Sequence, residues 1–100
     1  MIVVHGGAGK LDPERIDRVR AGVRAAAAAG RTLLERGGTA LDAVVSAVRV
    51  LENDPEFGCG TGAALTRDGT VETCASVMDG VRRRAGAVAA APELGAPVIV

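Results

Sequence analysis

Two consecutive amphipathic helices, joined through a pair of glycines, constrain the fold of this chain more than any other feature. Gly37 and Gly38 predict the C-terminal end of the first helix, and Thr39 with Asp42 three residues later predicts a capping box at the start of the second. The apolar stripe of the first helix consists of Ile16, Val19, Val23, Ala26, Ala27, Gly30, Leu33 and Leu34. The stripe of the second consists of Leu41, Val44, Val45, Val48 and Leu51. A connection this short predicts an antiparallel helical hairpin.

The segments that flank the hairpin predict strands. Residues 1–9, MIVVHGGAG, have the pattern of a short buried strand that runs into a glycine-rich turn. Asp12 is expected to cap the first helix, with Pro13 at its first position. At the other end of the hairpin, Asn53-Asp54-Pro55 ends the second helix, because proline disfavours a helical residue before it.

A β-meander is expected after the helices. Arg67-Asp68-Gly69-Thr70 predicts a two-residue hairpin turn. Residues 71–77 alternate between apolar and polar side chains, Asp79-Gly80 marks a second turn, and residues 85–91 predict a further strand. The expected order is therefore one strand, two helices and a meander, which is an α+β arrangement.

The composition predicts a core of small side chains. Hydrophobic residues make up 48% of the 100 residues, yet Phe57 is the only aromatic one, so the elements must approach closely to bury enough area.

Residues 98–100 end the sequence on an apolar run, and we expect residues 1–100 to be an incomplete domain, one part of a larger assembly. The formal net charge is zero, which argues against a field that attracts nucleic acid or anionic lipid. Two cysteines and the lack of a signal-peptide pattern favour the cytoplasm.

Residues 51–62, LENDPEFGCGTG, concentrate irregular backbone after the second helix. Cys59 lacks partners at ligand spacing for a transition-metal site, and the predicted strand register keeps it out of reach of Cys74 for a disulfide. What remains is carbonyl oxygen, the ligand that hard cations take. The residues by themselves leave two readings open, a plain connecting loop and a loop whose carbonyls bind a cation.

The HGGAG turn also leaves two readings open. It fails the dinucleotide fingerprint and the phosphate-loop pattern, so it is either a simple turn or a backbone that approaches a ligand. His5 is expected to be a packed, hydrogen-bonded histidine, since no second histidine exists. Each Gly-Thr pair has a local explanation, at Thr39, Thr61 and Thr70, so no nucleophile is assigned. A small nucleotide-binding domain is disfavoured by the failed fingerprints.

Taken together, IVVHGGAG, GGTALDAVVSAVRVLENDPEFGCGTGAALTRDGTVE, ASVMDG and RAGAVAA resemble the N-terminal part of the plant-type asparaginases, or isoaspartyl peptidases. The resemblance implies an N-terminal-nucleophile hydrolase with a four-layer αββα sandwich. A precursor cleaves itself before a threonine into α and β subunits, two αβ pairs assemble, and the freed threonine hydrolyses L-asparagine or β-aspartyl peptides. On this resemblance the chain is part of an α subunit, and the nucleophile lies outside it.

The resemblance also implies roles for two loops. It places His5, Gly6, Gly7 and Gly9 in a supporting loop near the nucleophile. It further implies a structural sodium ion, with no organic cofactor, held by the main-chain carbonyls of Leu51, Glu52, Asp54, Phe57, Cys59 and Thr61.

Two departures stand out. Gly58 occupies a position that is usually asparagine, and Cys74 one that is usually acidic. They keep an alternative open, a divergent non-catalytic binding or assembly module on the same scaffold.

Overall fold

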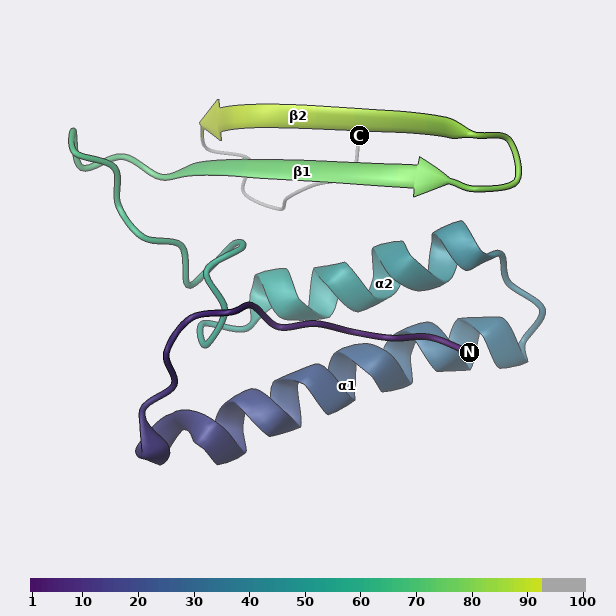
Figure 1. Cartoon of the computed structure of the whole chain (residues 1–100), viewed down its shortest axis with the longest axis horizontal. Helices are drawn as coiled ribbons and strands as arrows, with labels where there is room; N and C mark the ends of the chain where they lie inside the picture. Colours follow the sequence, from purple (N-terminus) through teal and green to yellow (C-terminus); the bar gives the residue numbers. More distant parts are fainter. Residues whose placement is uncertain (93–100) are drawn as a thin grey trace.

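The computed structural model describes residues 1–92, which form a helical hairpin and a two-stranded sheet (Figure 1). A short 3-10 helix, η1 (Pro13–Arg15), leads into α1 (Ile16–Glu35), and α2 (Ala40–Asn53) runs back alongside it. The strands β1 (Glu72–Asp79) and β2 (Arg84–Pro92) pair antiparallel. These elements confirm an α+β arrangement. The predicted apolar end, residues 98–100, lies outside the described residues.

The connection between α1 and α2 has the predicted chemistry. Gly37 adopts a left-handed φ of 82°, and the amides of Gly37 and Gly38 donate to the carbonyls of Leu34 and Leu33 at 3.1 and 2.8 Å. This is a Schellman ending, in which glycine accepts the backbone angle that other residues avoid.

Two reciprocal hydrogen bonds cap the N-terminus of α2. The Thr39 hydroxyl accepts from the Asp42 amide at 3.1 Å, and the Asp42 carboxylate accepts from the Thr39 amide at 3.2 Å. The capping box is therefore confirmed. The prediction for Asp12 was wrong in one respect: it precedes η1, but its side chain makes no capping hydrogen bond, and its carbonyl accepts from Arg15 instead.

The N-terminal segment is extended but is not a strand of a sheet, contrary to the prediction. Ile2 and Val4 are half-buried and pack on the core, while Val3 is 85% exposed, so the side chains alternate as in a strand. Within residues 1–92, however, β1 and β2 pair with each other and no strand pairs with this segment. Alternation alone does not make a strand, because a sheet also needs a hydrogen-bonded neighbour.

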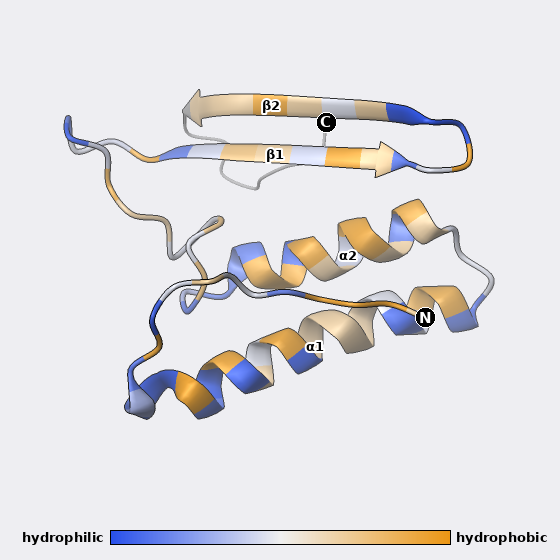
Figure 2. Ribbon diagram, viewed as in Figure 1, coloured by the Kyte–Doolittle hydropathy of each residue, from blue (hydrophilic) through white to orange (hydrophobic). Residues whose placement is uncertain are grey.

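The core lies where the two helices and the N-terminal segment meet, and its small side chains are as predicted. Its buried hydrophobic residues are Ala26, Ala43, Ala47, Leu51 and Phe57. Gly30 on α1 lies so near the Ala43 carbonyl of α2 that a methyl group there would sit 2.8 Å from that oxygen. Glycine thus permits the close helix contact. Figure 2 shows apolar residues on α2 and on the N-terminal segment beside the helices.

The predicted meander is only partly present. Residues 71–77 and 85–91 coincide closely with β1 and β2, but the hairpin strand expected before Arg67 does not form within the described residues. The turn closes three residues rather than two: Thr66 and Thr70 pair across it at 2.7 Å, and only Gly69 has positive φ. Asp79 begins the second turn as predicted, its carboxylate accepting from the Val81 amide at 3.0 Å.

The sheet carries a bulge at Cys74. The register shifts between Thr73, opposite Ala91, and Ala75, opposite Val88, and Ala90 has a positive φ of 49°. The Ala90 amide donates to the Cys74 sulfur at 3.4 Å. Cys74 is therefore held by β2, and both cysteines are free thiols. Neither helix of residues 1–92 is apolar enough over its length to cross a bilayer.

Candidate functional site

The loop that follows α2 returns to the end of the same helix. The Asp54 amide donates to the Leu51 carbonyl at 3.3 Å, and the Phe57 amide donates to the Asp54 carbonyl at 3.1 Å. The Thr61 amide then donates to the Glu52 carbonyl at 2.8 Å, which closes the loop on the last turn of α2. We refer to residues 54–62 as the α2 loop.

The α2 loop brings several backbone oxygens together. The carbonyls of Leu51, Glu52 and Asp54, three of the six predicted ligands, each accept one hydrogen bond and keep a second lone pair. A methyl group at Gly62 would collide with the carbonyl oxygens of both Pro55 and Phe57, so these two oxygens face the same point. Of the other predicted ligands, Thr61 closes the loop through the bond from its amide to the Glu52 carbonyl, and Cys59 lies exposed on the loop.

Glu52 is a buried carboxylic acid at the root of the α2 loop. The residue is 3% exposed, and its Oε2 atom has no hydrogen-bond partner among the described residues. Burial raises the pKa of Glu52 to about 7, against a smaller opposing effect of Arg49. Sequence reasoning assigned Glu52 only a carbonyl role, because nothing in the helical pattern marks a buried acid at the end of α2.

Cys59 has no activated thiol. Although the residue is exposed, partial desolvation of its sulfur raises the pKa of the thiol, and the carboxylates of Glu52 and Asp54 add to the effect. A raised pKa keeps the Cys59 thiol protonated at neutral pH, whereas the thiolate is the reactive form.

Phe57 fixes the α2 loop to the rest of the molecule. Its side chain is 4% exposed, and its ring lies against both Gly6 of the N-terminal turn and Gly22 of α1. A methyl group would lie 2.7 Å from the ring at Gly6 and 2.5 Å from it at Gly22. One aromatic side chain therefore joins three segments that are distant in the sequence.

Glu56, the neighbour of Phe57, pairs with two arginines at the start of α1. Its carboxylate accepts from Arg15 Nε at 2.9 Å and from Arg18 Nε at 2.5 Å, and its backbone oxygen accepts from Arg15 Nη2 at 2.8 Å. These hydrogen bonds from Arg15 and Arg18 lower the pKa of Glu56. No sequence signal pairs positions 38 and 41 residues apart, so this cluster was missed.

The glycine turn and the α2 loop line one pocket of about 320 Å³. Gly6, Gly7 and Gly9 lie on one side and Phe57 with Gly58 on the other, and Lys10 and Arg15 supply positive charge. His5 does not line it. That residue is exposed, and its Nδ1 accepts from the Gly7 amide at 3.3 Å. The expectation of a hydrogen-bonded histidine is confirmed, and the expectation of a packed one was wrong.

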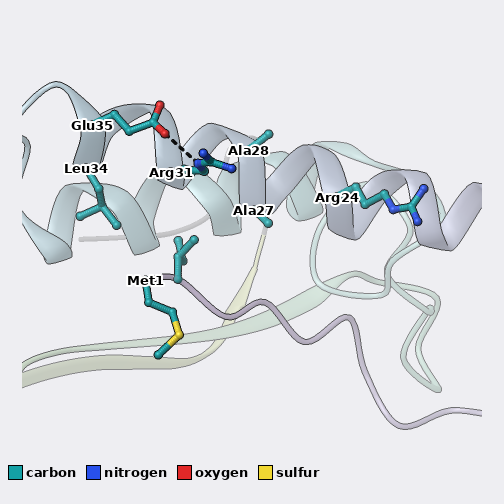
Figure 3. A pocket seen from close by; sticks show the side chains of 8 residues that line it. Met1, Arg24, Ala27, Ala28, Arg31, Leu34 and Glu35 are labelled. Carbon is teal, nitrogen blue, oxygen red and sulfur yellow. Dashed lines mark hydrogen bonds and ion pairs between the residues drawn. The ribbon is translucent and has the colours of Figure 1, made fainter.

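A second pocket, of about 620 Å³, lies between the N-terminus and α1 (Figure 3). Met1 and Ile2 face Ala27, Ala28 and Leu34 across it. The charged groups on its rim include Arg31, which pairs with Glu35 of its own helix at 2.7 Å. None of the predicted site residues lines this pocket.

Two glycines of the α2 loop are expected to respond oppositely to alanine. No atom lies within 4 Å of a methyl group at Gly58, so Gly58→Ala is expected to change the free energy of unfolding by no more than about 0.5 kcal/mol. At Gly60 the methyl group would collide with the Glu52 carbonyl, and Gly60→Ala is expected to cost about 1–3 kcal/mol. Urea denaturation of both variants measures the difference, and equal costs would contradict the closed loop.

Comparison with known proteins places these loops in context. The model of a family described as asparaginase matches residues 1–100. The chain is 53% identical over 89 residues to a plant-type L-asparaginase of Pyrococcus abyssi, covering 88% of this chain and 29% of the relative. It is 48% and 46% identical to proteins named isoaspartyl peptidase/L-asparaginase from Rattus norvegicus and Danio rerio, covering 98% of this chain and 30% and 32% of those relatives. The chain thus spans about a third of the length of these curated relatives.

Proposed function

Because the chain belongs to the asparaginase family, we propose that it forms the N-terminal portion of the α subunit of a threonine hydrolase. The proposed substrates are L-asparagine and β-aspartyl peptides, the two classes that the names of the relatives indicate. The observation that carries the proposal is the family match over all 100 residues.

The chemistry is proposed to belong to polypeptide outside this chain. A threonine freed by self-cleavage attacks the carbonyl carbon of the scissile amide, and its own amine takes the hydroxyl proton. The amine or ammonia of the substrate leaves with that proton as the acyl-threonine ester forms, and water then hydrolyses the ester to release the carboxylic acid and restore the threonine hydroxyl. The complete protein is proposed to be a cytoplasmic (αβ)2 assembly with a four-layer αββα sandwich, in which the helical hairpin and the β1–β2 sheet supply parts of two layers.

The α2 loop is proposed to bind a structural sodium ion through the carbonyls of Leu51, Glu52, Asp54, Phe57, Cys59 and Thr61. Its fit to a hard cation is supported by the ring that Thr61 and Glu52 close, and by the carbonyls that meet at Gly62. The Oε2 of Glu52, which has no hydrogen-bond partner within residues 1–92, adds a buried acidic oxygen to the residue whose carbonyl closes the loop. A bound ion would supply no reaction step and would hold the loop in shape.

The glycine turn is proposed to support the reacting threonine from the side of the 320 Å³ pocket. Gly6, Gly7 and Gly9 line this pocket together with Gly58, so the turn and the loop share one surface. Gly58 leaves that surface open, since no side chain projects from it. A group from outside this chain is proposed to occupy the space.

The proposal predicts that this chain alone is inactive. Purified chain is expected to release no ammonia from L-asparagine and no aspartate from β-aspartyl dipeptides. A polypeptide extended to the length of the relatives is expected to do both, after cleavage before a threonine that mass spectrometry would locate. Turnover by the isolated chain would contradict the proposal that the nucleophile lies outside it. An extended polypeptide that is neither active nor cleaved would favour the non-catalytic alternative.

A further inference from the structure

We infer that Arg15 and Arg18 act through Glu56 as positioning residues that set which way the carbonyls of the α2 loop point. The part of this inference that concerns sodium rests on the proposed function. It assigns the shape of the α2 loop to side chains that are not themselves proposed ligands of the ion. We call Arg15, Arg18 and Glu56 the arginine clamp.

The clamp is a set of three charge-assisted contacts, two from Arg15 of η1 and one from Arg18 of α1, to the loop. Each carboxylate oxygen of Glu56 accepts a hydrogen bond from the Nε of one arginine, and Arg15 also donates from Nη2 to the Glu56 carbonyl. The Glu56 side chain is 18% exposed, while the side chains of Arg15 and Arg18 are 36% and 59% exposed, so the carboxylate end of these pairs is the more shielded from water. A further bond, from the Glu56 amide to Asp54 Oδ1 at 3.0 Å, holds the preceding peptide unit, the one that carries the Pro55 carbonyl.

The Glu56 carbonyl and the carbonyls of the residues on either side of it point in different directions. The Glu56 carbonyl points out of the loop to Arg15, whereas the carbonyls of Pro55 and Phe57 before and after it both point toward Gly62. The three carbonyls therefore alternate in direction. Arg15 binds the one that points out of the loop, that of Glu56, and the other two, those of Pro55 and Phe57, point into it. The Phe57 carbonyl, a proposed sodium ligand, is one of these two.

Arginine is required by this geometry. A planar guanidinium offers several N–H groups in a fixed fork, so Arg15 binds a side-chain and a main-chain oxygen of one residue together. Lysine would retain the charge but would not hold both oxygens in the same orientation. The Arg31–Glu35 pair on the same helix has similar contact chemistry but does not touch the α2 loop, which makes Arg31 a matched control.

Amide hydrogen exchange of the full chain tests the inference. The reporters are the Phe57 amide, bonded to the Asp54 carbonyl, and the Thr61 amide, bonded to the Glu52 carbonyl. In Arg15→Gln, Arg15→Lys and Glu56→Gln we expect both to exchange about tenfold faster, the effect of losing one charge-assisted hydrogen bond. Arg31→Gln is expected to leave both unchanged, and the amides of α2 report whether each variant is folded.

The same exchange is measured in sodium chloride and in choline chloride at equal ionic strength. The sodium concentration that gives half-maximal protection is expected to rise about tenfold in Arg15→Lys and Glu56→Gln, and to stay constant in Arg31→Gln. Exchange at Phe57 and Thr61 within twofold of the unaltered protein in Arg15→Lys would overturn the inference, even if Arg15→Gln does not fold. Absence of any sodium effect in the unaltered protein would instead refute the ion site, while the exchange rates in choline chloride would still decide the role of the clamp.

Discussion

Replacing Phe57 by alanine is expected to lower the free energy of unfolding by about 3–5 kcal/mol, the range for losing a buried aromatic side chain. The effect is large because the other buried hydrophobic residues in the described part of the chain are three alanines and Leu51, which cannot move in to fill the space. The ring also joins the N-terminal turn, α1 and the α2 loop through Gly6 and Gly22. Urea denaturation followed by circular dichroism measures the loss.

Leu65 provides the control for Phe57. It is a large apolar residue that is 68% exposed, so Leu65→Ala is expected to change the free energy of unfolding by less than about 0.5 kcal/mol. Phe57→Leu is expected to fall between the two, because leucine retains part of the buried volume. A cost for Phe57→Ala no larger than for Leu65→Ala would mean that the ring does not hold the three segments together.

The second large effect is a loss of stability as the pH rises, caused by Glu52. Its pKa is about 7 in the folded chain, above the ordinary value of 4.5, so the folded state keeps a proton that the unfolded state releases between these values. The contribution of this group is therefore fully present below pH 4.5 and is lost as the pH rises through about 7. We expect a fall on the order of 3 kcal/mol between pH 5 and pH 8.

Glu52→Gln is expected to remove this dependence, because an amide of nearly the same shape carries no charge at any of these pH values. The variant should be more stable than the unaltered chain at pH 8 and close to it at pH 5. Glu35, an exposed acid of α1, is the control, and Glu35→Gln should leave the slope unchanged. Urea titrations at four pH values in sodium-free buffer measure the slopes, and a Glu52→Gln variant with the slope of the unaltered chain would contradict the assignment.

Part of the candidate site was readable from the sequence. The glycine turn and the α2 loop were both recognised, and the structure brings Gly6, Gly7 and Gly9 to the same pocket as Gly58. The role of the predicted carbonyl ligands stays a prediction. His5 was expected to be packed because no second histidine exists to share a ligand site, while the extended segment turns its side chain to solvent.

The groups that the sequence did not reveal are those whose partners lie far along the chain. Arg15 and Arg18 are two of several arginines in and around α1, and only the fold places Glu56 against them. Glu52 is a buried acid in the last turn of α2, where the Thr61 amide of the returning loop binds its carbonyl. An arginine or a glutamate in a helix is usually exposed, so helical periodicity does not mark either position.

The sequence by itself determined the two helices, the capping box of α2 and the turn between them. The hydrogen bonds that form these features join residues close in sequence, as at Thr39 with Asp42 and at Gly37 and Gly38. They can therefore be predicted from the local sequence alone. Only the tertiary structure decided that residues 1–5 pair with neither strand of residues 1–92, that Phe57 joins three segments, and that Arg15 binds the carbonyl of Glu56. These outcomes depend on which distant segments meet, because strand pairing and burial are properties of the assembled chain and not of any one stretch.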